Sequence, residues 1–314
     1  MLAEALNKFN DFFGDTHLAQ GKSNIGFLPK LSNELPYRYY DTKDRIYYNE
    51  NSIGILYEIS PVTGIYANHE QILTQLIDSG ISNKAKFQIL NWSSPDIERV
   101  LEIWQSKNKG KPYSDLAQKQ VEYFRKANFK PIFPDLPLVV RNQKLYMAIW
   151  LDLQKKNVTK AQIKELLKIQ GKVKKSFKDM GIYAQLLEPE GLIAFVAEIF
   201  DVGLEKKSVK WREGDFINHQ ICSEKQEFRI SDTIIEAGKE CAISAFKIKE
   251  YPENFKSFEM SRLLGDEDNP NLQISCPFLQ VLTAKRRNKA SELSSIQGKF
   301  ISNIEDSSKK KSLF

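Results

Sequence analysis

Residues 38–62, RYYDTKDRIYYNENSIGILYEISPV, contain two apolar runs separated by a short polar segment. The runs at 45–49 and 53–59 are rich in isoleucine and tyrosine, which favour β-strands. The segment Asn49-Glu50-Asn51-Ser52 between them is typical of a tight turn. The stretch therefore predicts a β-hairpin. Just before it, alternating tyrosine and arginine side chains at 37–40 follow the two-residue period of a strand.

Apolar periodicity extends this pattern along the next 140 residues. Leucine and isoleucine positions three and four residues apart predict helices, and β-branched runs predict strands. Ser94 and Pro95 resemble a helix start, Thr159 and Gln162 form a capping-box pattern, and Gly181 is a typical helix end. The predicted helices are 68–80, 95–104, 114–128, 160–180 and 189–200, and the further strands are 85–92, 144–153 and 182–187.

The order of these elements predicts an α+β fold with a mixed β-sheet covered by helices and no P-loop domain. The remainder of the chain looks strand-rich. We expect four parts: an N-terminal helix and loop at 1–30, an α+β domain at 31–205, a strand-rich second part at 206–284, and a basic, mobile tail at 285–314.

Composition limits the class of protein. The chain has 314 residues, of which 41% are hydrophobic, and a formal net charge of +6. This is typical of a globular protein, and no apolar run reaches the length of about 18 residues that a membrane-spanning helix needs. Three scattered cysteines favour a reducing cytosol over a disulfide framework.

Gly21-Lys22-Ser23 is the end of a nucleotide-binding P-loop pattern. The first glycine of that pattern is replaced by Thr16, and Gly26 and Pro29 argue against a helix directly after the loop. We therefore expect no ATP site of this type, and no enzymatic activity on this chain.

A metal site is also not expected. His219 and Cys222 have a spacing that suits zinc, but tetrahedral zinc needs four ligands, and the other cysteines, Cys241 and Cys276, stand alone in the sequence. No cofactor is predicted.

One charged pattern stands out. Four lysines recur every fourth residue on the predicted helix 160–180, so they form a ridge along one face. We call these residues the lysine ridge: Lys160, Lys164, Lys168 and Lys172. The ridge is either an ordinary solvated face or a contact for anionic lipid or an acidic partner.

Two short elements carry a family resemblance. LPYRYYD at 35–41 and NPNLQISCPFLQVLTA at 269–284 resemble the N-terminal half of the TraC family, the ATPases of F-type conjugative type IV secretion systems. The residues that match the family elements are Leu35, Pro36, Tyr37, Arg38 and Tyr40 in the first, and Ser275, Cys276, Pro277 and Phe278 in the second. Because Pro277 lacks an amide donor, we expect an edge or bulged strand there. Both elements are expected to define the fold more than to contact partners.

The resemblance implies a docking and assembly role in conjugative pilus formation and DNA or protein transfer. In that family the motor with its nucleotide-binding motifs follows this half. The resemblance therefore implies the front part of a longer ATPase, as an excised domain, a split gene product or a truncated remnant. The implied partners are inner-membrane secretion components, further copies of the chain or a separate motor chain, with peripheral contact to the cytoplasmic face of the inner membrane. An unrelated alternative, suggested by a sequence pI near 8.9, is a basic nucleic-acid-binding accessory protein of a mobile element. Nucleic acid is the less favoured partner.

Overall fold

The computed structural model describes residues 31–62, 64, 66–135, 138–153, 157–200, 209–221, 228–230, 234–237, 241–247 and 274–286. The expected N-terminal helix and the Gly21-Lys22-Ser23 segment lie outside these residues.

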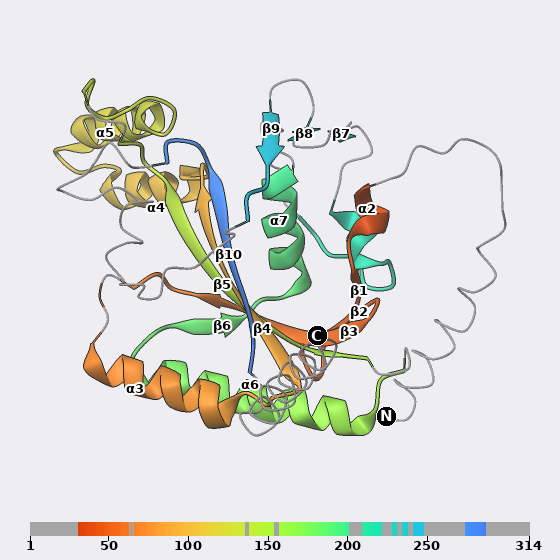
Figure 1. Ribbon diagram of the computed structural model, residues 1–314. Helices are drawn as coiled ribbons and strands as arrows, with labels where there is room; N and C mark the ends of the chain where they lie inside the picture. The colour runs from red at the N-terminus through yellow and green to blue at the C-terminus, as the bar shows by residue number, and fades with distance from the viewer. Residues whose placement is uncertain are drawn as a thin grey trace, which may run out of the picture.

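The described elements are arranged as a main sheet with helices and a small separate sheet (Figure 1). The main-sheet strands are β1 (Tyr37–Asp41), β2 (Ile46–Asn49), β3 (Ser52–Ile59), β4 (Ala85–Ser94), β5 (Asn142–Asp152), β6 (Ala184–Leu186) and β10 (Phe278–Lys285). The helices are α2 (Leu31–Glu34), α3 (Ala67–Gln75) with its π-helical extension η2 (Leu76–Gly80), α4 (Glu98–Asn108), α5 (Ser114–Ala127), α6 (Lys160–Asp179), α7 (Pro189–Phe200) and the 3-10 turn η3 (Ile217–Gln220). The small sheet contains β7 (Phe228–Ile230), β8 (Ile234–Ala237) and β9 (Cys241–Ser244).

The predicted hairpin starts the sheet. Strands β2 and β3 pair antiparallel, and β1 pairs with β2 on the other side. The strand order is β1-β2-β3-β5-β4-β10, with β6 also pairing with β3. The register places β2 against the N-terminal part of β3 and β6 against its C-terminal part. Strands β2 and β6 therefore share one edge of β3, while β5 occupies the whole of the other edge.

The centre of the sheet has a ferredoxin-like topology. Strands β3 and β4 are both antiparallel to β5, which lies between them, so β3-α3-β4 is a split β-α-β unit. Strand β6 is antiparallel to β3, so β5-α6-β6 is a second split unit with β3 in its gap. The two units interlock in the order β6-β3-β5-β4, and the helical hairpin α4–α5 is inserted between β4 and β5.

Helices cover both faces of the sheet, which makes three layers. Figure 1 shows α3 and α6 below the sheet and α7 above it. Alternating residues of β3 explain this: Ile53, Ile55 and Tyr57 pack in the cluster that includes α6, whereas Leu56 packs in the cluster under α7. A third, smaller cluster of Ile97, Leu101 and Val121 holds α4 and α5 together.

The α+β class is confirmed, as is the order of the predicted helices and strands from the hairpin to α7. The expected mixture of parallel and antiparallel pairing is not seen, because every ladder between described strands is antiparallel. The split units explain the difference: each crossover connects two parallel strands, but an antiparallel strand separates them.

Three details of the prediction change. Ser94 does not cap a helix; it ends β4, its Oγ accepts a hydrogen bond from the amide of Asp96 (2.9 Å), and α4 begins at Glu98. Residues 278–284, assigned to a strand-rich second part, pair with β4 in the main sheet, so the sheet crosses the expected boundary at 205. The expected tail from 285 begins inside β10, whose last residue is Lys285.

Candidate functional site

The first family element lies on an edge strand of the main sheet. Arg38 in β1 donates hydrogen bonds to the carbonyls of Leu35 and Tyr37 and to Glu50 (Nη2–Oε2, 3.1 Å). The amide of Glu50 in turn donates to the carbonyl of Pro36 (2.9 Å). These hydrogen bonds therefore hold the first family element against the turn between β2 and β3.

Tyr37 and Tyr40 of this element pack against the protein, whereas Tyr39 is exposed. Tyr40 is 3% exposed, and its ring lies 4.7 Å from the ring of Tyr47 and 5.9 Å from that of Trp211. Burial also raises the pKa of Tyr37 above 10.0. These contacts support the expected fold-defining role of the element.

The second family element leads into the opposite edge of the same sheet. Phe278, the first residue of β10, pairs with Ser93 of β4, β10 is the last of the described strands in the order, and Pro277 lies directly before it. The carbonyl of Ser275 accepts a hydrogen bond from Arg141 (Nη2–O, 2.6 Å). Cys276 is a free, exposed thiol. The two elements thus form opposite borders of one sheet.

Arg141 connects the second element to the helical hairpin. Its other guanidinium nitrogen donates to the side chain (Nη1–Oδ1, 2.5 Å) and to the carbonyl of Asn128, which follows α5. Asn128 donates to the carbonyl of Pro95 (2.5 Å) and is 4% exposed. Burial lowers the pKa of the Arg141 guanidinium from its ordinary value, with the nearby Cys276 opposing this. The Arg141 side chain therefore connects the start of β5 with the end of α5 and with the segment before β10.

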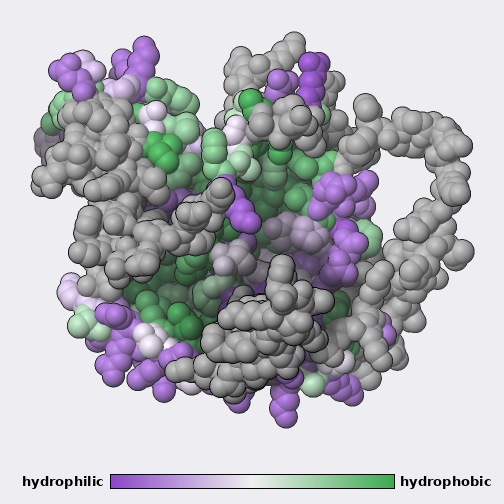
Figure 2. Space-filling view, in the orientation of Figure 1, coloured by the Kyte–Doolittle hydropathy of each residue, from purple (hydrophilic) through white to green (hydrophobic). Residues whose placement is uncertain are grey.

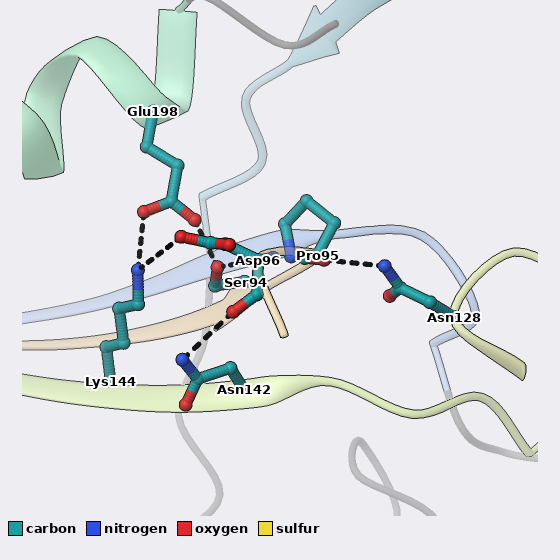
Figure 3. A network of polar contacts seen from close by, with 7 residues as sticks. All are labelled: Ser94, Pro95, Asp96, Asn128, Asn142, Lys144 and Glu198. Carbon is teal, nitrogen blue, oxygen red and sulfur yellow. Dashed lines mark hydrogen bonds and ion pairs between the residues drawn. The ribbon is translucent and has the colours of Figure 1, made fainter. Parts of the chain in front are cut away.

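A group of charged and polar side chains lies beside this contact, at the end of β4 and the start of β5 (Figure 3). We call it the junction cluster: Ser94, Asp96, Lys144 and Glu198. Lys144 lies 2.6 Å from Glu198 (Nζ–Oε2) and 3.8 Å from Asp96 (Nζ–Oδ2). Ser94 donates to the other carboxylate oxygen of Glu198. Asn142 donates to the carbonyl of Asp96 (3.0 Å), which fixes the turn after β4.

Burial makes this cluster energetically important. The side chain of Glu198 is 8% exposed, and those of Lys144 and Asp96 are 20% and 23% exposed. A carboxylate so poorly solvated needs a cation and hydrogen-bond donors close by, and Lys144 and Ser94 provide them. The cluster joins α7, β4 and β5, and its polar groups bind one another. The arrangement is suited to fixing the orientation of the hairpin and α7.

The described residues contain no cluster of side chains placed to hold a metal ion. No group of three or more His, Cys, Asp or Glu side chains gathers there. His219 is exposed, on η3, while Cys222 lies outside the described residues. Within the described ranges no helix has the length and apolarity to cross a membrane.

The four lysines of the lysine ridge differ in their exposure to solvent. Lys160, Lys164 and Lys168 are exposed on α6. Lys172 is half-buried and donates to the carbonyl of Ser79 at the end of η2 (Nζ–O, 2.6 Å). A cation is favourable at that position because the last carbonyls of a helix carry partial negative charge. Lys172 therefore has an internal role, and three lysines are left on the outer face.

Sequence reasoning did not select the junction residues. Two signals could have indicated them: Glu198 is an isolated acid in the apolar run GLIAFVAEIF, and Lys144 comes directly before the apolar strand LYMAIWL. An isolated charge in an apolar element must find a partner, but its identity depends on the tertiary fold.

Comparisons with known proteins agree with the resemblance. A family model described as "TraC protein" matches residues 31–313, which include both motif elements. Protein TraC of Escherichia coli (strain K12) is 22% identical over 277 residues, which are 82% of this chain and 31% of that relative. The chain therefore spans about a third of the length of this relative.

Proposed function

Since the chain belongs to the TraC protein family, we propose that it is a docking and assembly part of a conjugative type IV secretion system. In this role it takes part in pilus assembly and in the transfer of DNA or protein. The observation that carries the proposal is the family match over residues 31–313, which reaches from the first sheet-edge element to beyond the second.

The contacts of the described residues favour docking over catalysis. Arg38, Arg141 and Lys144 all use their charged groups on internal partners, so they stabilise a particular shape of the sheet and hairpin. We propose that ATP hydrolysis is supplied by a separate motor, in another part or another chain. In that case a fluorescent ATP analogue with magnesium shows no binding to the chain, and micromolar binding that Lys22→Ala abolishes would contradict this.

We further propose that the protein is cytoplasmic and docks peripherally on the inner membrane. Its partners are inner-membrane secretion components, with self-association or the motor chain as further contacts. Specific protein contacts supply most of the affinity, and surface lysines add a weaker, salt-sensitive attraction to anionic lipid.

Cell fractionation tests this location. We expect the chain to sediment with inner membranes when the other transfer genes are present, and to resist a high-salt wash there. Expressed alone, it should be released from membranes by the same wash, because lipid attraction is screened by salt. An equal distribution with and without the transfer genes would contradict docking on secretion components.

A further inference from the structure

The helical hairpin α4–α5 presents large apolar side chains to solvent. On α4, Val100, Ile103 and Trp104 are 54%, 48% and 37% exposed, and on α5, Leu116 and Tyr123 are 60% and 49% exposed. Spacings of three, four and seven residues place these side chains on a common stripe of each helix. Figure 2 shows hydrophobic and hydrophilic residues side by side at the upper left, where Figure 1 places the hairpin.

These side chains are not needed for the packing of the hairpin itself. The two helices are held by the buried cluster of Ile97, Leu101 and Val121, and by the ion pair between Arg125 and Glu98 (2.8 Å). Exposed apolar side chains gathered on one element indicate an interaction surface, whereas single ones scattered over a protein do not.

Lysines interrupt the same stripes. Lys107 follows Ile103 by four residues on α4, and Lys119 lies between Leu116 and Tyr123 on α5. At the tip of the hairpin, Lys109 and Lys111 flank Gly110, and the ammonium of Lys111 lies 5.7 Å from the ring centre of Tyr113. In the described part of the chain none of these four lysines has an acidic partner, although Arg125 does.

From this combination we propose that the α4–α5 hairpin inserts shallowly into the headgroup region of an anionic lipid bilayer. Trp104, Tyr113 and Leu116 reach the boundary between headgroups and acyl chains, where aromatic side chains are favoured. The lysine stems lie along the apolar surface while their ammonium groups bind lipid phosphates.

Two other occupants fit less well. A protein helix seated on the stripes would bury Lys107 and Lys119, which is unfavourable unless each met an acid on that helix. A second copy of the chain would bring the lysines of two hairpins together, with like charges in contact. A bilayer accepts both the apolar groups and the lysines without a matching shape.

This inference rests on the proposed peripheral docking and assigns it to a particular surface. In Figure 1 the hairpin lies at the upper left, and α6 runs along the lower edge. The exposed lysines of α6 therefore belong to a different element from the hairpin, and variants of the two surfaces separate the alternatives.

The experiment measures flotation of the purified chain with vesicles of phosphatidylcholine alone and of phosphatidylcholine with phosphatidylglycerol. The hairpin variant is Trp104→Ser with Leu116→Ser, and the ridge variant is Lys160→Gln, Lys164→Gln and Lys168→Gln. The control removes two exposed aromatic groups elsewhere, Tyr66→Ser with Tyr183→Ser, which are 72% and 66% exposed. Because none of these positions belongs to a core cluster, circular dichroism should show folded protein in every case.

We expect the wild-type chain to bind the anionic vesicles only, with a blue shift of tryptophan emission that Trp104→Phe removes. The hairpin variant should bind at least about tenfold more weakly, while the ridge and control variants bind as the wild type.

Loss of vesicle binding in the ridge variant alone would overturn the inference but leave peripheral docking intact. Absence of wild-type binding to either vesicle would overturn the lipid contact itself, and fractionation with the transfer genes would then test docking on proteins. Hairpin-dependent binding to purified secretion components without vesicle binding would identify a protein as the occupant and would also overturn it.

Discussion

Lys144 is the residue on which the junction cluster depends. It is the cation within 4 Å of both Glu198 and Asp96, and it lies at the start of β5 directly beneath α7. Removing it leaves two carboxylates close together, one of them almost fully buried. A buried charge without its partner is far more unfavourable than a missing surface ion pair.

We therefore predict that Lys144→Met lowers the free energy of unfolding by about 2–4 kcal/mol. The double variant Lys144→Met, Glu198→Leu should recover a substantial part of that loss, because no uncompensated carboxylate then stays at the Glu198 position. Urea denaturation measures both free energies of unfolding, provided that their dependence on urea concentration is the same for the variants and the wild type.

The control for this prediction is Arg212→Gln, which breaks the exposed pair between Arg212 and Asp215 (2.9 Å) and should change stability by less than about 1 kcal/mol. Equal losses for Lys144→Met and Arg212→Gln would show that the junction cluster does not contribute to stability.

At this scale the sequence predicted the local contacts but missed the long-range ones. The capping box of Thr159 and Gln162 is confirmed, with the amide of Gln162 donating to Thr159 (3.2 Å) and the amide of Thr159 donating to Gln162 (3.0 Å). The contact between Lys144 and Glu198 joins residues 54 positions apart, and the contact between Arg141 and Ser275 joins residues 134 apart. Such pairs are specified by the topology, which periodicity alone does not encode.

Among the elements, β3 has strands on both edges: β5 lies along one, and β2 and β6 share the other. Gly54 in this strand lies opposite Trp150 of β5. A Cβ atom at Gly54 would lie 2.8 Å from the carbonyl oxygen of Ile149 and 3.0 Å from the Cβ of Trp150. Two strands approach closely there, and the backbone of β5 cannot move away without breaking its ladders.

Two glycine-to-alanine substitutions should consequently have opposite effects. Gly54→Ala forces β3 and β5 apart and should lower stability by about 1–3 kcal/mol. Gly171→Ala, in the middle of α6 with open space around its Cβ position, should raise stability by about 0.5–1 kcal/mol. Thermal unfolding of the two variants beside the wild type gives the comparison. If Gly54→Ala were as stable as the wild type, the close packing of β3 against β5 would be wrong.

The elements also show where periodicity is informative. On α6 the periodic apolar residues Ile163, Leu166, Val173 and Phe177 are buried, and Leu167 packs partly buried against the same cluster, because that helix lies flat on the sheet. On α4 the same kind of spacing does not mark a uniformly buried face. Leu101 is buried, but Val100 and Trp104 are exposed, because the hairpin extends beyond the sheet and little covers its outer face. A stripe of apolar residues indicates a contact surface and does not say whether the partner is internal.

For the molecule as a whole, buried tyrosines link stability to alkaline pH. Burial raises the pKa of four tyrosines well above the ordinary value of 10.0: Tyr47, Tyr48, Tyr57 and Tyr146. In the unfolded chain these phenols ionise near pH 10, whereas in the folded protein they keep their protons. Below pH 10 both states are protonated and stability is unaffected. Above pH 10 the unfolded state loses protons first, so stability falls as the pH rises.

We predict a cooperative unfolding transition above pH 10, in which absorbance of tyrosinate from the buried residues appears together with loss of circular dichroism. Each fully protected tyrosine contributes up to about 1.4 kcal/mol per pH unit above 10. Early ionisation of all tyrosines in a protein that stays folded would contradict the burial of these residues.

The whole-molecule arrangement was the hardest part to predict from sequence. The α+β class followed from the order of elements, but the position of β10 did not, because a strand near residue 280 pairs with one near residue 90. Likewise, the interlocking of the two split units depends on which strand pairs between the two strands of each unit. This long-range pairing is not visible in any local sequence pattern. The location of the two family elements at opposite borders of the sheet is therefore known only from the structure.

The central claim is that the protein serves a conjugative secretion system, and mating efficiency tests it most directly. In a conjugation-proficient donor that encodes this chain, the gene is removed in frame and supplied again on a plasmid. We predict that transfer to recipients falls to the level of a donor without a mating apparatus, and that the wild-type chain restores it while Lys144→Met restores it poorly. Unchanged transfer after removal of the gene would contradict the proposed function.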